Sequence, residues 1–257
     1  MEYRVPDQLE SSERTRLGHL TSLADRGSAR TLARLGVCPG ASVLEVGAGN
    51  GSLARWMAET VGPSGRVVAT DVDDRFVDAG DDVEFRVHDI TSFPPEQSLF
   101  DVAHARAVLE HLPARAEALA NMVAATKPGG VVVVEDIDWH HFDEQPLPEP
   151  FSTLHFALRA AAVAGYGYDP YYGGKLHQSL AQAGLEDIDV RGRVYLMHGG
   201  TPNCEWYIGA LANAAPGLVA AGVIDQVTAD AAVAQGRDPA FKAQSPVSNA
   251  AWGRRPL

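Results

Sequence analysis

A glycine-rich stretch beginning at residue 47 is the part of the sequence whose spacing most clearly indicates chemistry. Glu45 lies at the end of an apolar run, and glycines then recur at every second position, as Gly47, Gly49 and Gly51. Glycines let the backbone approach a ligand without a Cβ clash, and Glu45 could face a positively charged amino group. The spacing differs from the Gly-x-Gly-x-x-Gly pattern of dinucleotide sites. It favours a nucleoside that carries an amino acid, with a purely structural turn as the alternative.

Two aspartates extend this pattern along the chain. Asp71 ends the next apolar run about 20 residues after the glycines, where a carboxylate can accept both ribose hydroxyls. Asp89 ends the third run and could accept a hydrogen bond from an adenine amino group. Each aspartate alone is more often a turn or a helix cap. Their positions in series favour an adenosine ligand.

Histidines and aromatic residues follow the later apolar runs. His104, His111, His140 and His141 lie within or after the fourth or fifth run, where a neutral imidazole could take a phenolic or enolic proton. His104 falls within the expected strand, which favours a structural role. Adjacent histidines point apart, so His140 and His141 do not predict a metal site. The aromatic residues between positions 139 and 172 could roof an apolar substrate or form the core of a lid.

The elements that must position these residues alternate between short β-branched runs and helical periodicity. The expected strands are 42–46, 66–71, 83–89, 100–105, 131–137, 188–197 and 247–254. The expected helices are 10–35 with a break at Gly27, 52–60, 114–126, 151–164, 174–183 and one or two within 204–234. Alternation of this kind predicts a Rossmann-like, doubly wound α/β sheet.

Composition limits the class of protein. Hydrophobic residues make up 46% of the 257 residues, enough for the core of one large α/β domain. The formal net charge of -12 disfavours nucleic acid and anionic membrane surfaces as partners, because both bind clustered Lys and Arg. The two cysteines, Cys38 and Cys204, are far apart and predict neither a disulfide framework nor a zinc site. With no targeting signal or membrane-spanning run, we expect a cytoplasmic protein.

Six motifs in their order along the chain resemble those of class I S-adenosylmethionine (SAM) dependent methyltransferases, of the ubiquinone/menaquinone-biosynthesis-like branch. They are Leu44-Glu-Val-Gly-Ala-Gly-Asn-Gly-Ser52, Ala69-Thr-Asp71, His88-Asp-Ile90, Phe100-Asp-Val102, Val108-Leu-Glu-His-Leu112 and Lys127-Pro-Gly-Gly130. The resemblance is strong from about residue 37 to 138. It implies seven strands in the order 3-2-1-4-5-7-6, with the last strand antiparallel. It also implies one SAM-binding domain over 1–257, with a helical cap at 1–36 and substrate-lid insertions at 139–172 and 199–246.

The resemblance also implies roles for individual residues. The predicted cofactor-binding residues are Glu45, Gly47, Ala48, Gly49 and Gly51 around the methionine part, Asp71 and Val72 at the ribose, Asp89 and Ile90 at the adenine, and Arg106 beside the cofactor. His111 is the predicted base. Asp136 is its orienting or alternative partner, and His140 is held in reserve.

The predicted activity is methyl transfer from SAM to an oxygen, carbon or nitrogen nucleophile of a small, partly aromatic metabolite, with S-adenosylhomocysteine as product. Two departures from the family pattern refine it. Only about eleven residues separate Asp71 from the third strand, so the intervening helix must be short. The Asn/Asp-Pro-Pro-Tyr motif of nucleic-acid amino-methylating enzymes is absent after the fourth strand. A non-methylating cyclisation or rearrangement and a non-catalytic SAM-binding subunit remain alternatives, and a homodimer is compatible with the sequence.

Overall fold

The computed structural model describes residues 6–257, so residues 1–5 of the expected cap lie outside the described part of the chain. Its strands are β1 Ser42–Val46, β2 Arg66–Asp71, β3 Glu84–Val87, β4 Phe100–Arg106, β5 Thr126–Asp138, β6 Glu186–Arg193, β7 Leu196–His198, β8 Lys242–Gln244 and β9 Val247–Arg254. Its α-helices are α1 Glu10–Leu35, α2 Ser52–Val61, α3 Arg115–Ala125, α4 His140–Asp143, α5 Phe151–Tyr166, α6 Leu176–Gln182, α7 Pro202–Ala220 and α8 Gln226–Arg237. Short 3-10 helices are η1 Asp7–Leu9, η2 Asp74–Phe76, η3 Leu109–His111 and η4 Tyr172–Lys175.

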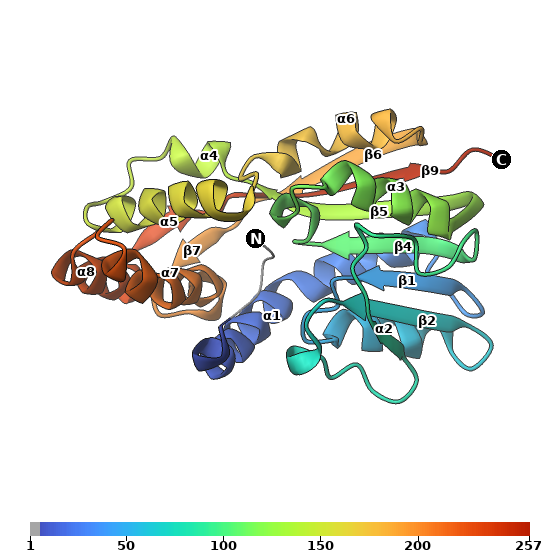
Figure 1. Ribbon diagram of the computed structural model, residues 1–257, viewed down its shortest axis with the longest axis horizontal. Helices are drawn as coiled ribbons and strands as arrows, with labels where there is room; N and C mark the ends of the chain where they lie inside the picture. The colour runs from blue at the N-terminus through green and yellow to red at the C-terminus, as the bar shows by residue number, and fades with distance from the viewer. Residues whose placement is uncertain (1–5) are drawn as a thin grey trace.

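Seven of the strands form one sheet in the order β3-β2-β1-β4-β5-β9-β6 (Figure 1). Strand β9 is antiparallel to both of its neighbours, and the pairings among the other strands are parallel. The predicted order and the antiparallel last strand are therefore confirmed. Parallel pairing brings the carboxyl ends of β1, β2, β4 and β5 to one edge of the sheet, where ligands of open α/β sheets bind.

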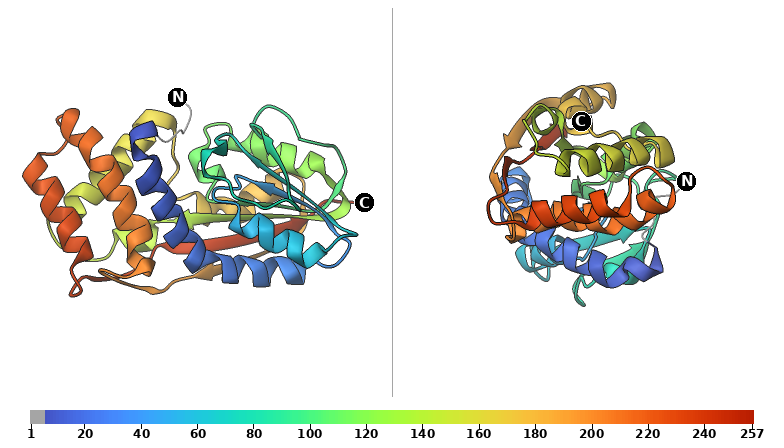
Figure 2. Two further views of the ribbon diagram at one scale, coloured as in Figure 1. Left: turned by 90° about the horizontal axis from the view of Figure 1, so that it is seen from below. Right: turned by 90° about the vertical axis from the view of Figure 1, so that its left-hand side faces the viewer.

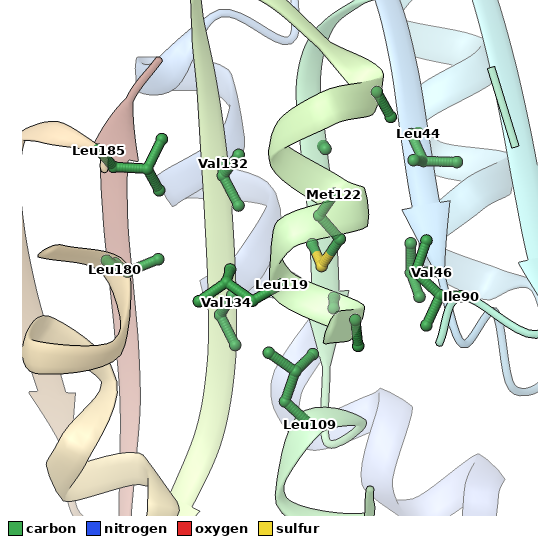
Figure 3. Close-up of a cluster of buried hydrophobic side chains, with 14 of the residues drawn as sticks. Leu44, Val46, Ile90, Leu109, Leu119, Met122, Val132, Val134, Leu180 and Leu185 are labelled. Carbon is green, nitrogen blue, oxygen red and sulfur yellow. The ribbon is translucent and has the colours of Figure 1, made fainter. Parts of the chain in front are cut away.

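Apolar side chains hold helices against both faces of this sheet. On one face α3 and α6 pack over β1, β4 and β5 through residues such as Leu44, Met122 and Leu180 (Figure 3). On the other face α2 and the carboxyl-terminal half of α1 pack through Met57 and Leu32. Burial on both faces explains why the central strands read as continuous apolar runs.

A helical lobe made of α4, α5, α7, α8 and the β7–β8 ribbon lies beyond the carboxyl edge of the sheet (Figure 1). Its helices share one apolar core that includes Phe142, Phe151, Tyr207 and Trp139. Helix α1 runs from this lobe to the sheet, and the amino-terminal part of α1 contacts α7 (Figure 2). Much of the aromatic content after residue 138 is thus lobe core. Among residues 6–257, no helix is both long and apolar enough to cross a bilayer.

Several boundaries differ from the sequence expectation. The strand expected over 188–197 is divided between β6 and β7, which belong to different sheets. The short segment after β2 is the single turn η2, as its length required. Helix α1 continues through Gly27. The space that a Cβ would fill at Gly27 is occupied by a side chain from β6. A Cβ on Gly27 would lie 1.2 Å from Arg193 Nη1, while Arg193 Nη2 donates to Glu135 Oε2 at 3.0 Å.

Alanine at the two glycines of α1 tests this explanation. Gly18→Ala should raise the free energy of unfolding by about 0.5–1 kcal/mol, the usual gain in a helix interior, since nothing lies within 4 Å of its Cβ position. Gly27→Ala should lower it, because the guanidinium of Arg193 must leave the Glu135 carboxylate. Urea denaturation measures both changes. Equal stabilisation by the two substitutions would show that Gly27 has no packing role.

Candidate functional site

The glycine loop, residues Gly47 to Gly51, connects β1 to α2 and has three glycines with positive φ. The φ angles are +71° at Gly47, +57° at Gly49 and +79° at Gly51. A Cβ on Gly47 would lie 2.3 Å from Val108 Cγ2, and one on Gly51 would lie 2.8 Å from backbone atoms of Ala79. At Gly49, by contrast, nothing lies within 4 Å of the Cβ position. Gly47 and Gly51 are therefore needed for packing, while Gly49 presents bare backbone to open space.

Asp71 lies directly beside Gly49. Its Oδ2 accepts a hydrogen bond from Gly49 N at 2.9 Å, and its Oδ1 accepts one from Asp73 N at 3.0 Å. Burial raises the pKa of Asp71, although these amide donors oppose the change. The next residue, Val72, exposes an apolar side chain, whereas Ala48 in the loop is buried. A carboxylate and an apolar surface thus adjoin the open backbone.

The predicted adenine pair divides into one exposed and one buried side chain. Asp89 is exposed, and its Oδ1 accepts hydrogen bonds from Thr91 N at 2.8 Å and Thr91 Oγ1 at 2.7 Å. Ile90 is buried in the sheet core near Val46 (Figure 3). The predicted adenine-binding role of Ile90 stays a prediction, and the burial of its side chain leaves the backbone of Ile90 as the part that would face a ligand.

Glu45 and Arg106 occupy the ends of adjacent strands and are both paired within the protein. Glu45 Oε2 lies 2.5 Å from His104 Nδ1. The carboxylate that we expected to face a ligand's amino group is therefore paired with His104. Arg106 donates to Asp25 Oδ1 at 2.7 Å and to Ser28 Oγ at 3.0 Å. Helix α1, for which the sequence predicted only a cap, therefore supplies polar groups to this edge.

His111 lies on η3, directly after β4. Its ring stacks on Tyr168, with 5.0 Å between ring centroids, and its Nε2 lies 3.4 Å from Glu110 Oε1. Burial, together with the charge of Arg16, lowers the pKa of His111 to about 3. The imidazole is therefore neutral at ordinary pH, which is the form that accepts a proton.

Two buried carboxyl groups brace η3 against the end of β5. Asp136 Oδ1 accepts from Val108 N at 3.1 Å, and Glu110 Oε2 accepts from Ile137 N at 2.8 Å. Burial raises the pKa of Glu110 to about 8. Burial also raises the pKa of Asp136, and the neighbouring Glu110 adds to this increase. Both groups consequently favour their protonated forms.

Glu110 Oε1 lies beside the His111 ring, and Asp136 as the partner of His111 stays a prediction. Asp136 fixes the backbone of η3. His140 is exposed, lies 2.6 Å from Asp138 Oδ1 through Nδ1, and stacks on Tyr171 at 3.9 Å.

Comparison with known proteins decides the family. A family model described as a methyltransferase domain matches residues 18–190, more than half of the chain. The chain belongs to the class I SAM-dependent methyltransferases. It is 30% identical over 182 residues to the ubiquinone/menaquinone biosynthesis C-methyltransferase UbiE of Ralstonia pickettii, a match that covers 62% of this chain and 73% of the relative.

Solved structures share the methyltransferase fold at low sequence identity. Phosphoethanolamine N-methyltransferase 2 of Haemonchus contortus, bound to phosphomonomethylethanolamine and S-adenosylhomocysteine, matches with a TM-score of 0.59 and 17% identity, over 100% of this chain and 61% of that one. The [4+2]-cyclase SpnF matches with a TM-score of 0.58 and 20% identity, over 92% of this chain and 83% of that one.

SAM, the cofactor of this methyltransferase family, fits the residues present. Gly49 provides a cradle that a Cβ would fill, and Asp71 provides a carboxylate beside it. The methyltransferase should therefore lose cofactor affinity when Gly49 acquires a side chain.

Gly49→Ala is expected to weaken binding of S-adenosylhomocysteine by at least about tenfold, or ~1.4 kcal/mol. Gly184→Ala is the matched control, because Gly184 also has a positive φ of +81° and nothing within 4 Å of its Cβ position, but lies between α6 and β6. Both variants bear the cost of a left-handed alanine, about 1–2 kcal/mol. Calorimetric titration compares their affinities, and wild-type affinity in Gly49→Ala would remove the loop from the site.

Proposed function

We propose that this methyltransferase transfers the methyl group of SAM to an oxygen, carbon or nitrogen nucleophile of a small, partly aromatic metabolite. The observation that carries the proposal is the convergence, at one sheet edge, of the glycine loop with Asp71 and of the neutral His111 imidazole. The names of two similar proteins support it, since UbiE is a C-methyltransferase and the Haemonchus contortus enzyme is an N-methyltransferase. Both names refer to small molecules, ubiquinone or menaquinone in one case and phosphoethanolamine in the other.

In the proposed site, the glycine loop and Arg106 hold the amino-acid part of SAM, Asp71 and Val72 hold the ribose, and Asp89 lies at the adenine. Bound SAM supplies an electrophilic methyl group. The protein's contribution is chiefly to orient the nucleophile in line with that group and to exclude water. His111 accepts the nucleophile's proton.

The helical lobe and α1 are proposed to close over the acceptor; the insertions 139–172 and 199–246 were expected to act as substrate lids. Tyr168 supports this, because it stacks on His111 while its hydroxyl accepts a hydrogen bond from Trp139 Nε1 at 2.9 Å. Trp139 belongs to the lobe core. One aromatic wall of the acceptor site is thus anchored in the lobe.

A non-methylating reaction is the second candidate function, favoured by the fold shared with the cyclase SpnF. The buried, protonated carboxyls near His111 could donate hydrogen bonds to a substrate carbonyl and so polarise it. Release of S-adenosylhomocysteine during turnover separates the two functions, since methyl transfer produces one molecule per product and a cyclisation produces none.

Removal of the proposed base should leave cofactor binding intact. His111→Ala is expected to reduce kcat by about 10²–10⁴-fold with an acceptor that must lose a proton, while the affinity for SAM stays unchanged. His141→Ala is the control, because His141 is exposed and its Nε2 contacts Gln244 Oε1 at 2.6 Å. Steady-state kinetics and calorimetry separate the two effects. A parallel fall in kcat and SAM affinity would make His111 a structural residue.

A further inference from the structure

Three ionisable side chains are buried next to one another on adjacent strands of the sheet. Glu45 on β1, His104 on β4 and Glu135 on β5 are 3%, 0% and 1% exposed. His104 Nδ1 lies 2.5 Å from Glu45 Oε2, and His104 Nε2 lies 3.6 Å from Glu135 Oε1. The ring therefore stands between two carboxylates on the face of the sheet that α1 covers.

The geometry favours a proton on each nitrogen of His104. A neutral imidazole has one N–H donor and could satisfy only one of the two carboxylates. Within residues 6–257, neither His104 Nε2 nor Glu135 Oε1 has a hydrogen-bond partner, and the two atoms face each other at 3.6 Å. The imidazolium form supplies a donor to both sides, and it removes the cost of burying two adjacent negative charges.

The charged groups around this ring form a balanced set. Arg193 from β6 donates to Glu135 Oε2 at 3.0 Å, and Ser28 from α1 donates to the same oxygen at 2.9 Å. Arg106 from β4 pairs with Asp25 from α1 at 2.7 Å. With His104 protonated, three cations offset the three carboxylates. Loss of the His104 proton would leave one negative charge buried in excess.

This cluster is continuous with the glycine loop. Glu45 precedes Gly47 by two residues, and its carbonyl oxygen accepts a hydrogen bond from Thr70 Oγ1 at 3.3 Å. Asp25, the partner of Arg106, also accepts from Ser52 Oγ at 2.7 Å, and Ser52 is the first residue of α2. Both ends of the loop are thus tied to the cluster, one through β1 and the other through α1.

We propose that His104 is a positioning residue of the cofactor site, which as a buried cation between Glu45 and Glu135 holds β1 and α1 in the arrangement that binds SAM. This inference rests on the proposed cofactor site. His104 touches neither cofactor nor acceptor in this account. It acts through Glu45 on one side and through Glu135 and Ser28 on the other.

The proposal gives cofactor affinity a dependence on pH. Burial alone would lower the pKa of His104, but the two carboxylates outweigh it and raise the pKa to about 9. The same contact keeps the pKa of Glu135 lowered despite its burial. The cation is present below that range and is lost as the pH rises through about 9. Affinity for S-adenosylhomocysteine should then weaken at alkaline pH.

The test combines nitrogen-15 NMR of the apoprotein with calorimetric titration of S-adenosylhomocysteine from pH 6 to 10. Both ring nitrogens of His104 should be protonated at pH 7. His104→Gln, which keeps one donor but no charge, should weaken binding by about tenfold at pH 7 and abolish the further weakening near pH 9. The pKa of Glu110 is raised to about 8, so its titration also changes the affinity in this pH range. Because Glu110 is present in both proteins, the difference between wild type and variant isolates the contribution of His104.

His155→Gln is the matched control, because His155 is also fully buried and its Nε2 lies 3.0 Å from Asp143 Oδ1, but in the helical lobe. It should leave the affinity unchanged. Wild-type affinity in folded His104→Gln would overturn the inference alone. A neutral His104 ring at pH 7 would overturn it even if that variant does not fold. Failure of the wild-type protein to bind S-adenosylhomocysteine would overturn the proposed function and this inference together.

Discussion

The structure depends on how it offsets the cost of burying acidic side chains where the parallel strands of the sheet end. Apolar packing on both faces assembles the strands, but it also removes the acidic residues at their ends from water. A buried carboxylate is costly unless it is hydrogen-bonded, paired or protonated. The chain uses all of these solutions. Asp71 accepts backbone amides, Glu45 pairs with His104, and Glu110 and Asp136 favour their protonated forms.

These solutions divide the edge into two chemically different parts. Near β1 and β2 the carboxylates are held by amides and cations, and this part adjoins the bare backbone of Gly49. Near η3 and the end of β5, Glu110 and Asp136 favour their neutral forms, and the imidazole of His111 is neutral as well. A positively charged sulfonium cofactor suits the first part. We propose that the methyl acceptor lies at the second part, where Tyr168 stacks on His111 and its hydroxyl contacts Trp139 of the lobe.

Local patterns predicted the strands and the glycine loop, because strand periodicity and glycine spacing are short-range signals. The order of the strands followed from the family resemblance. Local patterns could not predict partners that the fold brings together from distant positions. His104 is 59 residues from Glu45, and Gly27 reads as a helix break until Arg193 is seen to occupy the missing Cβ position. The contact between Glu110 and His111 forms within one 3-10 turn. Side-chain direction at that scale is set by tertiary packing.

The most direct test of the cofactor site is calorimetric titration of S-adenosylhomocysteine into the wild-type protein and the Asp71→Ala variant. Asp71 is the carboxylate that joins β2 to the glycine loop through Gly49 N. The account predicts 1:1 binding to the wild type, and a loss of about 1–3 kcal/mol in the variant, the scale for hydrogen bonds to a charged group. Equal affinity in the two proteins would contradict it.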